Sequence, residues 1–120
     1  MSRREARSSQ GGRVEFTDLG GGTFAVSGEL GFATAMEALH TSRRLFEQHT
    51  CIEVDLAGVV RADSAGLALL LEWVTWARHT AREISFRNIP AQIISFAEIS
   101  EVEDMLRLGE RWTGADLETA

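Results

Sequence analysis

The chain has 120 residues and a formal net charge of −6, and such an acidic chain is a poor general binder of nucleic acid or anionic membranes. The length suits one domain. No apolar segment follows the N-terminal arginines, so we expect no signal peptide. No apolar run approaches about 18 residues, so we expect no direct membrane insertion. We therefore expect a cytoplasmic protein. The single cysteine, Cys51, excludes an intrachain disulfide, and its place at the start of an apolar stretch predicts a core position.

The predicted elements begin after a polar stretch, residues 1–12, which we expect to be disordered. Residues 13–19 alternate in polarity, as in a strand with one wet face, and the three glycines that follow indicate a turn into a second strand. The next segment is predicted to be helical, with Phe32, Met36, Leu39 and Leu45 or Phe46 on its apolar side. In chain order, the predicted strands are 13–19, 23–30, 51–59 and 83–89, and the predicted helices are 31–50, 64–78 and 90–100.

This order of elements, β-β-α-β-α-β-α, predicts a single α/β domain. Helices between strands favour parallel crossovers, whereas the opening hairpin adds an antiparallel pair, so the sheet should be mixed and mostly parallel. Because the strands alternate in polarity, the helices should lie mainly on one face. Residues 101–112 fit either a short helix or a last strand, and the acidic residues 109–120 are expected to form a flexible tail.

The junction between the third strand and the second helix is the most informative part of the sequence. The strand is expected to end near Leu56, and Asp63 and Ser64 then stand where the helix must start. Their side-chain oxygens can accept from free first-turn N–H groups, and such a cap stabilises a helix by about 1 kcal/mol. Gly66 costs about 1 kcal/mol relative to alanine, which either a close approach by another backbone or partner, or tight packing on the chain's own sheet, would offset.

The same helix has two apolar stripes, although one is enough to cover a sheet. The first stripe consists of Leu67, Leu70, Leu71 and Val74. The second consists of Ala65, Leu69, Trp73 and Trp76. Exposed tryptophan and leucine at helical spacing are typical of protein interfaces, so we expect the second stripe to face a partner unless the C-terminal segment covers it.

Taken together, these features resemble the STAS domain, over about residues 13–108. The residues that match its signature are Val54, Asp55, Leu56, Asp63, Ser64, Gly66 and Leu67. In the STAS proteins that antagonise anti-sigma factors, the phosphorylated serine directly precedes the glycine, and here that position is Ala65. The stretch is more similar to the STAS subunit of the Mla phospholipid ABC transporters, in which a threonine usually stands where this chain has Ser64.

This resemblance implies a non-enzymatic cytoplasmic subunit that binds the transporter's ATPase subunit through the helix beginning at Ser64 and supports its assembly and activity. Through the ATPase, the chain would lie beside the permease complex at the inner membrane. The partner-binding residues expected from the motif and the second stripe are Asp63, Ser64, Ala65, Gly66, Leu69, Trp73 and Trp76. The alternative function is an anti-sigma factor antagonist that is regulated by phosphorylation of Ser64.

An enzyme is the least favoured class. The histidines His40, His49 and His79 share no local motif with an acid, cysteine or serine, and each is interpreted as a surface or helix-end residue. The sequence has no metal-ligand spacing and no phosphate-binding loop before a helix. We therefore expect no catalytic residue, cofactor, metal or small-molecule substrate.

Overall fold

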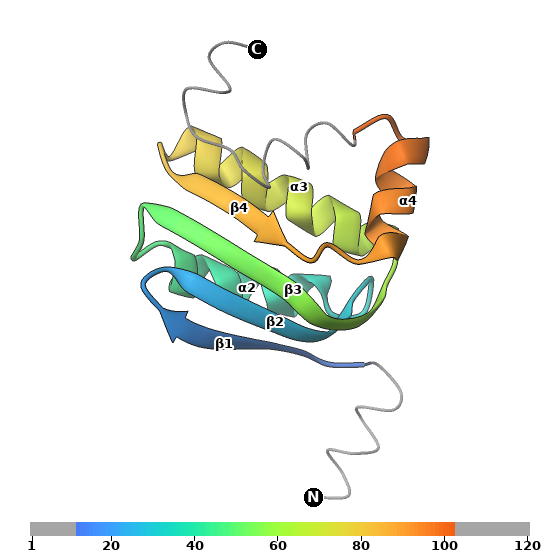
Figure 1. Ribbon diagram of the computed structural model, residues 1–120, viewed down its shortest axis with the longest axis horizontal. Coiled ribbons are helices and arrows are strands. Elements are labelled where there is room, and N and C mark those ends of the chain that lie inside the picture. The colour runs from blue at the N-terminus through green and yellow to red at the C-terminus, as the bar shows by residue number, and fades with distance from the viewer. Residues whose placement is uncertain (1–11, 103–120) are drawn as a thin grey trace, which may run out of the picture.

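A four-stranded mixed sheet with helices packed against it runs through residues 12–102, the part of the chain that the computed structural model describes (Figure 1). The elements in chain order are β1 (Val14–Gly20), β2 (Thr23–Leu30), α2 (Ala35–Phe46), β3 (Cys51–Ala62), α3 (Ser64–His79), β4 (Glu83–Arg87) and α4 (Ala91–Ile99). The predicted order of strands and helices is confirmed. The predictions for the acidic tail, for the N-terminal stretch before Gly12 and for any element beyond Val102 lie outside the described residues.

The sheet has the strand order β1-β2-β3-β4. β1 and β2 pair antiparallel across a glycine turn, in which the Gly20 N–H donates to Asp18 Oδ1 over 2.9 Å. β2 pairs with β3, and β3 with β4, in parallel, so α2 and α3 are the crossover connections. The predicted mixed and mostly parallel sheet with its opening hairpin is therefore correct.

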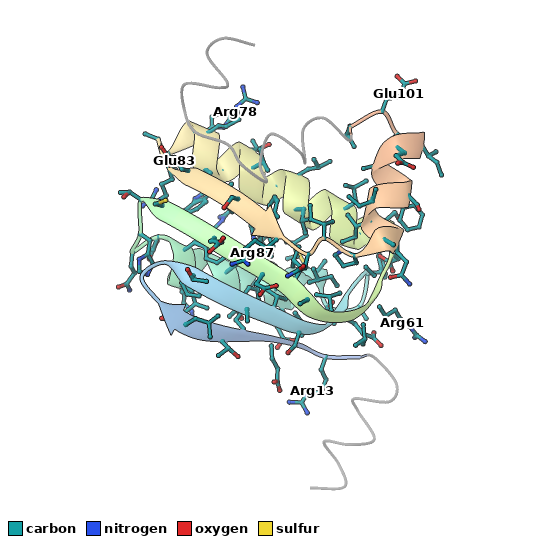
Figure 2. All side chains as sticks on the ribbon, viewed as in Figure 1. Arg13, Arg61, Arg78, Glu83, Arg87 and Glu101 are labelled. Atoms are coloured by element: carbon teal, nitrogen blue, oxygen red, sulfur yellow. The ribbon has the colours of Figure 1, made fainter. Side chains whose placement is uncertain are left out.

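The two faces of the sheet differ in polarity. Figure 1 shows α2 and α3 behind the sheet and α4 packed beside α3 at one end, so no helix among residues 12–102 covers the other face, which we call the uncovered face. Apolar side chains of all four strands point into the core beneath the helices, among them Val14, Phe24, Val26, Ile52, Val54, Leu56, Ile84 and Phe86. Polar side chains such as Glu53 and Asp55 alternate with them, and Figure 2 shows Arg87 over the middle of the uncovered face. This alternation explains why the helices gather on one side, as predicted.

The apolar side predicted for the first helix is wrong at two positions. Phe32 and Met36 are 87% and 67% exposed, because α2 begins only at Ala35 and faces the core through other residues. The buried residues of α2 are Ala38, Ser42 and Phe46, which recur every four residues. One of them, Ser42, lies against the indole of Trp73, whose Nε1–H donates to Ser42 Oγ over 2.8 Å.

β3 is longer than predicted, and Cys51 is not in the core. The strand continues past Leu56 to Ala62 because its last residues still pair with β2, with Ala62 opposite Leu30. Cys51 is exposed at the start of β3, where its Sγ lies 3.8 Å from Glu83 Oε1. Pleat alternation explains the error, because Ile52 takes the inward position and leaves its neighbour facing outward. Within residues 12–102, none of the helices has the length and apolar character needed to cross a membrane.

Candidate functional site

The first turn of α3 is capped by Asp63, as the sequence predicted. Asp63 has an extended backbone, and its Oδ1 accepts a hydrogen bond from the Ala65 N–H over 2.8 Å. The Asp63 carbonyl also accepts from the Gly66 N–H over 2.9 Å. Ser64 is the first residue of the helix and is exposed, so its hydroxyl is open to solvent at the positive end of the helix dipole.

Gly66 is required by packing within the chain. A Cβ atom at this position would collide with the carbonyl oxygen of Leu30, the last residue of β2. Gly66 is buried, so no partner backbone is needed to explain why a glycine stands within the first turns of the helix. Of the alternatives raised by the sequence, tight packing of α3 on its own sheet is therefore the one that the structure supports.

The expectation that the second stripe of α3 is exposed and faces a partner is wrong for Leu69 and Trp73. Leu69 and Trp73 are only 4% and 2% exposed, and Trp76 and Ala65 are half-buried. α3 contacts α2 on one side and α4 on the other, so both of its apolar stripes are covered by described parts of the chain. Leu69, Trp73 and Gly66 consequently offer no surface to a partner in this conformation.

Trp73 is a core residue held from several sides. Its ring lies 5.4 Å from the ring of Phe46, 6.2 Å from that of Phe16 and 6.3 Å from that of Phe86, measured between centroids. The geometries with Phe46 and Phe16 are edge-to-face, which is favourable for aromatic pairs. Further along α3, the Arg82 guanidinium lies 4.8 Å from the centre of the Trp76 ring and partly covers it.

Two exposed apolar residues, Phe32 and Met36, come from the loop before α2 and from the first turn of α2. Oδ2 of Asp63 accepts a hydrogen bond from the Phe32 N–H over 3.2 Å, so this loop and the start of α3 lie side by side. Phe32 is almost fully exposed, and Met36 follows one turn later in α2. We call the four exposed residues Phe32, Met36, Asp63 and Ser64 the Phe32–Ser64 patch.

Thr34 holds the loop of the patch in shape. Its Oγ1 accepts from the Gly31 N–H over 3.1 Å and donates to the Glu29 carbonyl over 2.8 Å. The Thr34 side chain is 2% exposed, so both bonds are shielded from water. Hydrogen bonds to Thr34 and to Asp63 therefore fix the backbone around Phe32, and the exposed Phe32 side chain stands on an ordered loop.

A family model described as "Mlab, STAS domain" matches residues 6–108. This chain belongs to the STAS-domain family. A comparison with curated proteins finds no match. Among the matching solved structures is that of the anti-sigma factor antagonist SpoIIAA in its unphosphorylated form, with 16% identity, a TM-score of 0.57, and coverage of 77% of this chain and 84% of that one. At this identity the likeness concerns the fold.

The signature residues of this STAS domain occupy two structural roles. Val54 and Leu56 are core residues of β3, while Asp55 lies on the uncovered face. The Asp55 carboxylate accepts from the Asn88 amide and from the Ala57 N–H, both over 2.9 Å. These bonds, with the Asn88 bond the larger influence, lower the pKa of Asp55 below its ordinary value. This carboxylate therefore ties β3 to the loop after β4, away from the Phe32–Ser64 patch.

The patch suits contact with another protein, since it combines apolar side chains, a hydroxyl and a carboxylate on one surface. Within residues 12–102, no three His, Cys, Asp or Glu side chains are grouped so that they could hold a metal ion. The sequence placed Asp63 and Ser64 correctly at the start of the helix, and both residues are exposed. It missed Phe32 and Met36, although the four-residue spacing of Ala38, Ser42 and Phe46 was a signal that the core side of α2 lies elsewhere.

Proposed function

We propose that this STAS-domain protein is a non-enzymatic subunit of a Mla-type phospholipid ABC transporter. In this role it binds the cytoplasmic ATPase subunit through the Phe32–Ser64 patch and supports assembly of the ATPase with the permease. The protein would then be cytoplasmic and peripheral to the inner membrane through its partner. The observation that carries the proposal is the exposure of Phe32 and Met36, in the loop and first turn of α2, where the Phe32 N–H is bonded to Asp63 next to the exposed Ser64.

Two further observations support the proposal. The matching family model is described by the name Mlab, and it covers all of the described residues. The residue before Gly66 is Ala65, which has no hydroxyl, and its N–H is occupied by the capping carboxylate of Asp63. Binding of another protein therefore explains the residues at the start of α3 better than a phosphorylation switch does.

Co-purification of the full chain with the ATPase subunit encoded beside it tests the proposal. We expect a stable complex, and we expect Phe32→Asp to weaken it about tenfold or more, because a charge would replace an exposed aromatic anchor. Ile99→Asp is the matched control, since Ile99 is 80% exposed at the end of α4 and lies outside the patch. Absence of a complex with the wild-type chain would refute the function, and equal losses in both variants would refute the surface.

A second candidate function follows from the exposed hydroxyl of Ser64. Phosphorylation there would place an anion at the start of α3, which the helix dipole favours and the adjacent Asp63 opposes. The chain would in that case be an anti-sigma factor antagonist controlled by a kinase. Incubation with a kinase encoded nearby, followed by mass spectrometry, distinguishes the two functions: a phosphate on Ser64 favours the antagonist, and an unmodified chain favours the transporter subunit.

A further inference from the structure

The carboxylate of Asp63 does more than cap a helix. Its two oxygens accept from two backbone N–H groups that are far apart in sequence, with Oδ1 bonded to Ala65 in α3 and Oδ2 to Phe32 in the loop before α2. The Asp63 N–H also donates to the Leu30 carbonyl over 3.2 Å. One side chain therefore joins the end of β2, the loop and the start of α3.

Two glycines make this close junction possible. A Cβ atom at Gly31 would lie 2.8 Å from Asp63 Oδ2, so a side chain there would push the carboxylate away from the Phe32 N–H. A side chain at Gly66 would displace α3 from the Leu30 carbonyl. The lack of a side chain at Gly31 thus leaves the space that the second hydrogen bond of Asp63 needs, and the lack of one at Gly66 lets α3 pack close to β2.

The second bond fixes the geometry of an exposed surface. Phe32 and Met36 have little packing of their own to hold them, because most of each side chain is in solvent. A loop that is already held in the bound arrangement loses less conformational entropy when a partner binds. The bond from Asp63 to the Phe32 N–H is a direct link between this loop and the helix turn that carries Ser64.

We propose that Asp63 is a positioning residue, which holds Phe32 in fixed relation to Ser64 so that a partner meets the Phe32–Ser64 patch as one preformed surface. This inference rests on the proposed function for the identity of the partner, the ATPase subunit. The link within the free chain does not depend on that identity.

Asp63→Asn tests the link in the full chain. Asparagine has the same shape and caps helices as well as aspartate, but it has one acceptor oxygen where aspartate has two. We expect the amide hydrogen of Phe32 to exchange with solvent about tenfold faster, measured by NMR, while that of Ala65 stays protected. Asp63→Ser should have the same effect, because the serine hydroxyl can cap the helix but is too short to reach Phe32. Unchanged exchange at Phe32 in both variants would overturn the proposal.

Asp18→Asn is the matched control for the loss of one charge. Asp18 is also an exposed aspartate that accepts a backbone N–H, but it lies near the end of β1, before the turn into β2. We expect this variant to leave both the exchange at Phe32 and the affinity for the ATPase subunit unchanged. A change in Phe32 exchange as large as that caused by Asp63→Asn would show a general charge effect and overturn the proposal.

A double-mutant cycle separates positioning from direct contact with the partner. We expect Asp63→Asn to weaken binding of the ATPase subunit about tenfold in the wild-type background and to have almost no effect in a Phe32→Ala background. An equal effect in both backgrounds would mean that Asp63 acts on binding independently of Phe32, and it would overturn the positioning role. If the wild-type chain does not bind the ATPase subunit, the proposed function fails, and the exchange at Phe32 still decides the link.

Discussion

Buried hydrogen bonds between side chains help to fix the arrangement of this core. The Trp73 indole N–H donates to Ser42, and the Ser42 hydroxyl in turn donates to the Leu39 carbonyl over 2.9 Å. Ser42 is fully buried, so each polar atom of this chain of bonds depends on the next. The sequence could not reveal this pair, because 31 positions separate the two residues and no local pattern relates them.

Ser42→Ala should destabilise the domain by about 1–3 kcal/mol, because it leaves the indole N–H of Trp73 buried without an acceptor. The measurement is the free energy of unfolding in urea. Ser95→Ala is the control, since Ser95 is exposed on α4 and its replacement should change stability by no more than about 0.5 kcal/mol. Equal stability of the two variants would show that the buried bond does not contribute.

Among the elements, α3 shows most clearly what a sequence pattern can and cannot predict. Its start at Ser64 and its cap followed from local chemistry, because side-chain oxygens at a helix start act within a few residues. The burial of Leu69 and Trp73 depended instead on α2 and α4 lying on either side of the helix. Helical periodicity gives the apolar faces of one helix, but it does not say how many neighbours cover them.

Gly66→Ala separates local propensity from packing within α3. Propensity alone predicts a gain of about 1 kcal/mol, whereas the collision with the Leu30 carbonyl predicts a loss of about 1–3 kcal/mol. We expect the loss, measured as a lower free energy of unfolding in urea. Ala68→Gly at an exposed position of the same helix calibrates the propensity term and should cost about 1 kcal/mol. A Gly66→Ala variant more stable than the wild type would contradict the packing argument.

In the whole molecule, the parallel strands set where the patch lies. β2 and β3 run in the same direction, so the loop after one and the helix after the other meet at the same edge of the sheet. The fold class predicted from the element order therefore already implied that Phe32 and Ser64 would lie near each other. The hydrogen bond that joins them, and the exposure of Phe32, required the actual path of the loop.

A carboxylate on the uncovered face, that of Asp55, makes the stability of the fold depend on pH. The pKa of Asp55 is lowered in the folded state, chiefly by the Asn88 amide, so its bonds contribute stability above the ordinary pKa that is lost as the pH falls. Asn88→Gly removes the amide and keeps the left-handed backbone of that position, which has φ 59°. We expect the pKa of Asp55 to rise towards its ordinary value.

NMR titration of the Asp55 carboxyl measures this rise directly, and urea unfolding gives the linked change in stability. The loss of stability caused by Asn88→Gly should be largest at about pH 7, well above the ordinary pKa of aspartate, and should shrink as the pH falls and the Asp55 carboxyl takes up a proton. An unchanged pKa in the variant would show that the Asn88 bond does not control this group.

The exposed thiol of Cys51 has a practical consequence for work on this domain. Cys51 begins β3 and Ser64 follows its end, so the whole of the longest described strand separates the chain's single cysteine from the Phe32–Ser64 patch. A dye or a solid support attached through that sulfur would leave the patch pointing away from the point of attachment. The molecule therefore carries its own handle for oriented immobilisation, without any engineered residue.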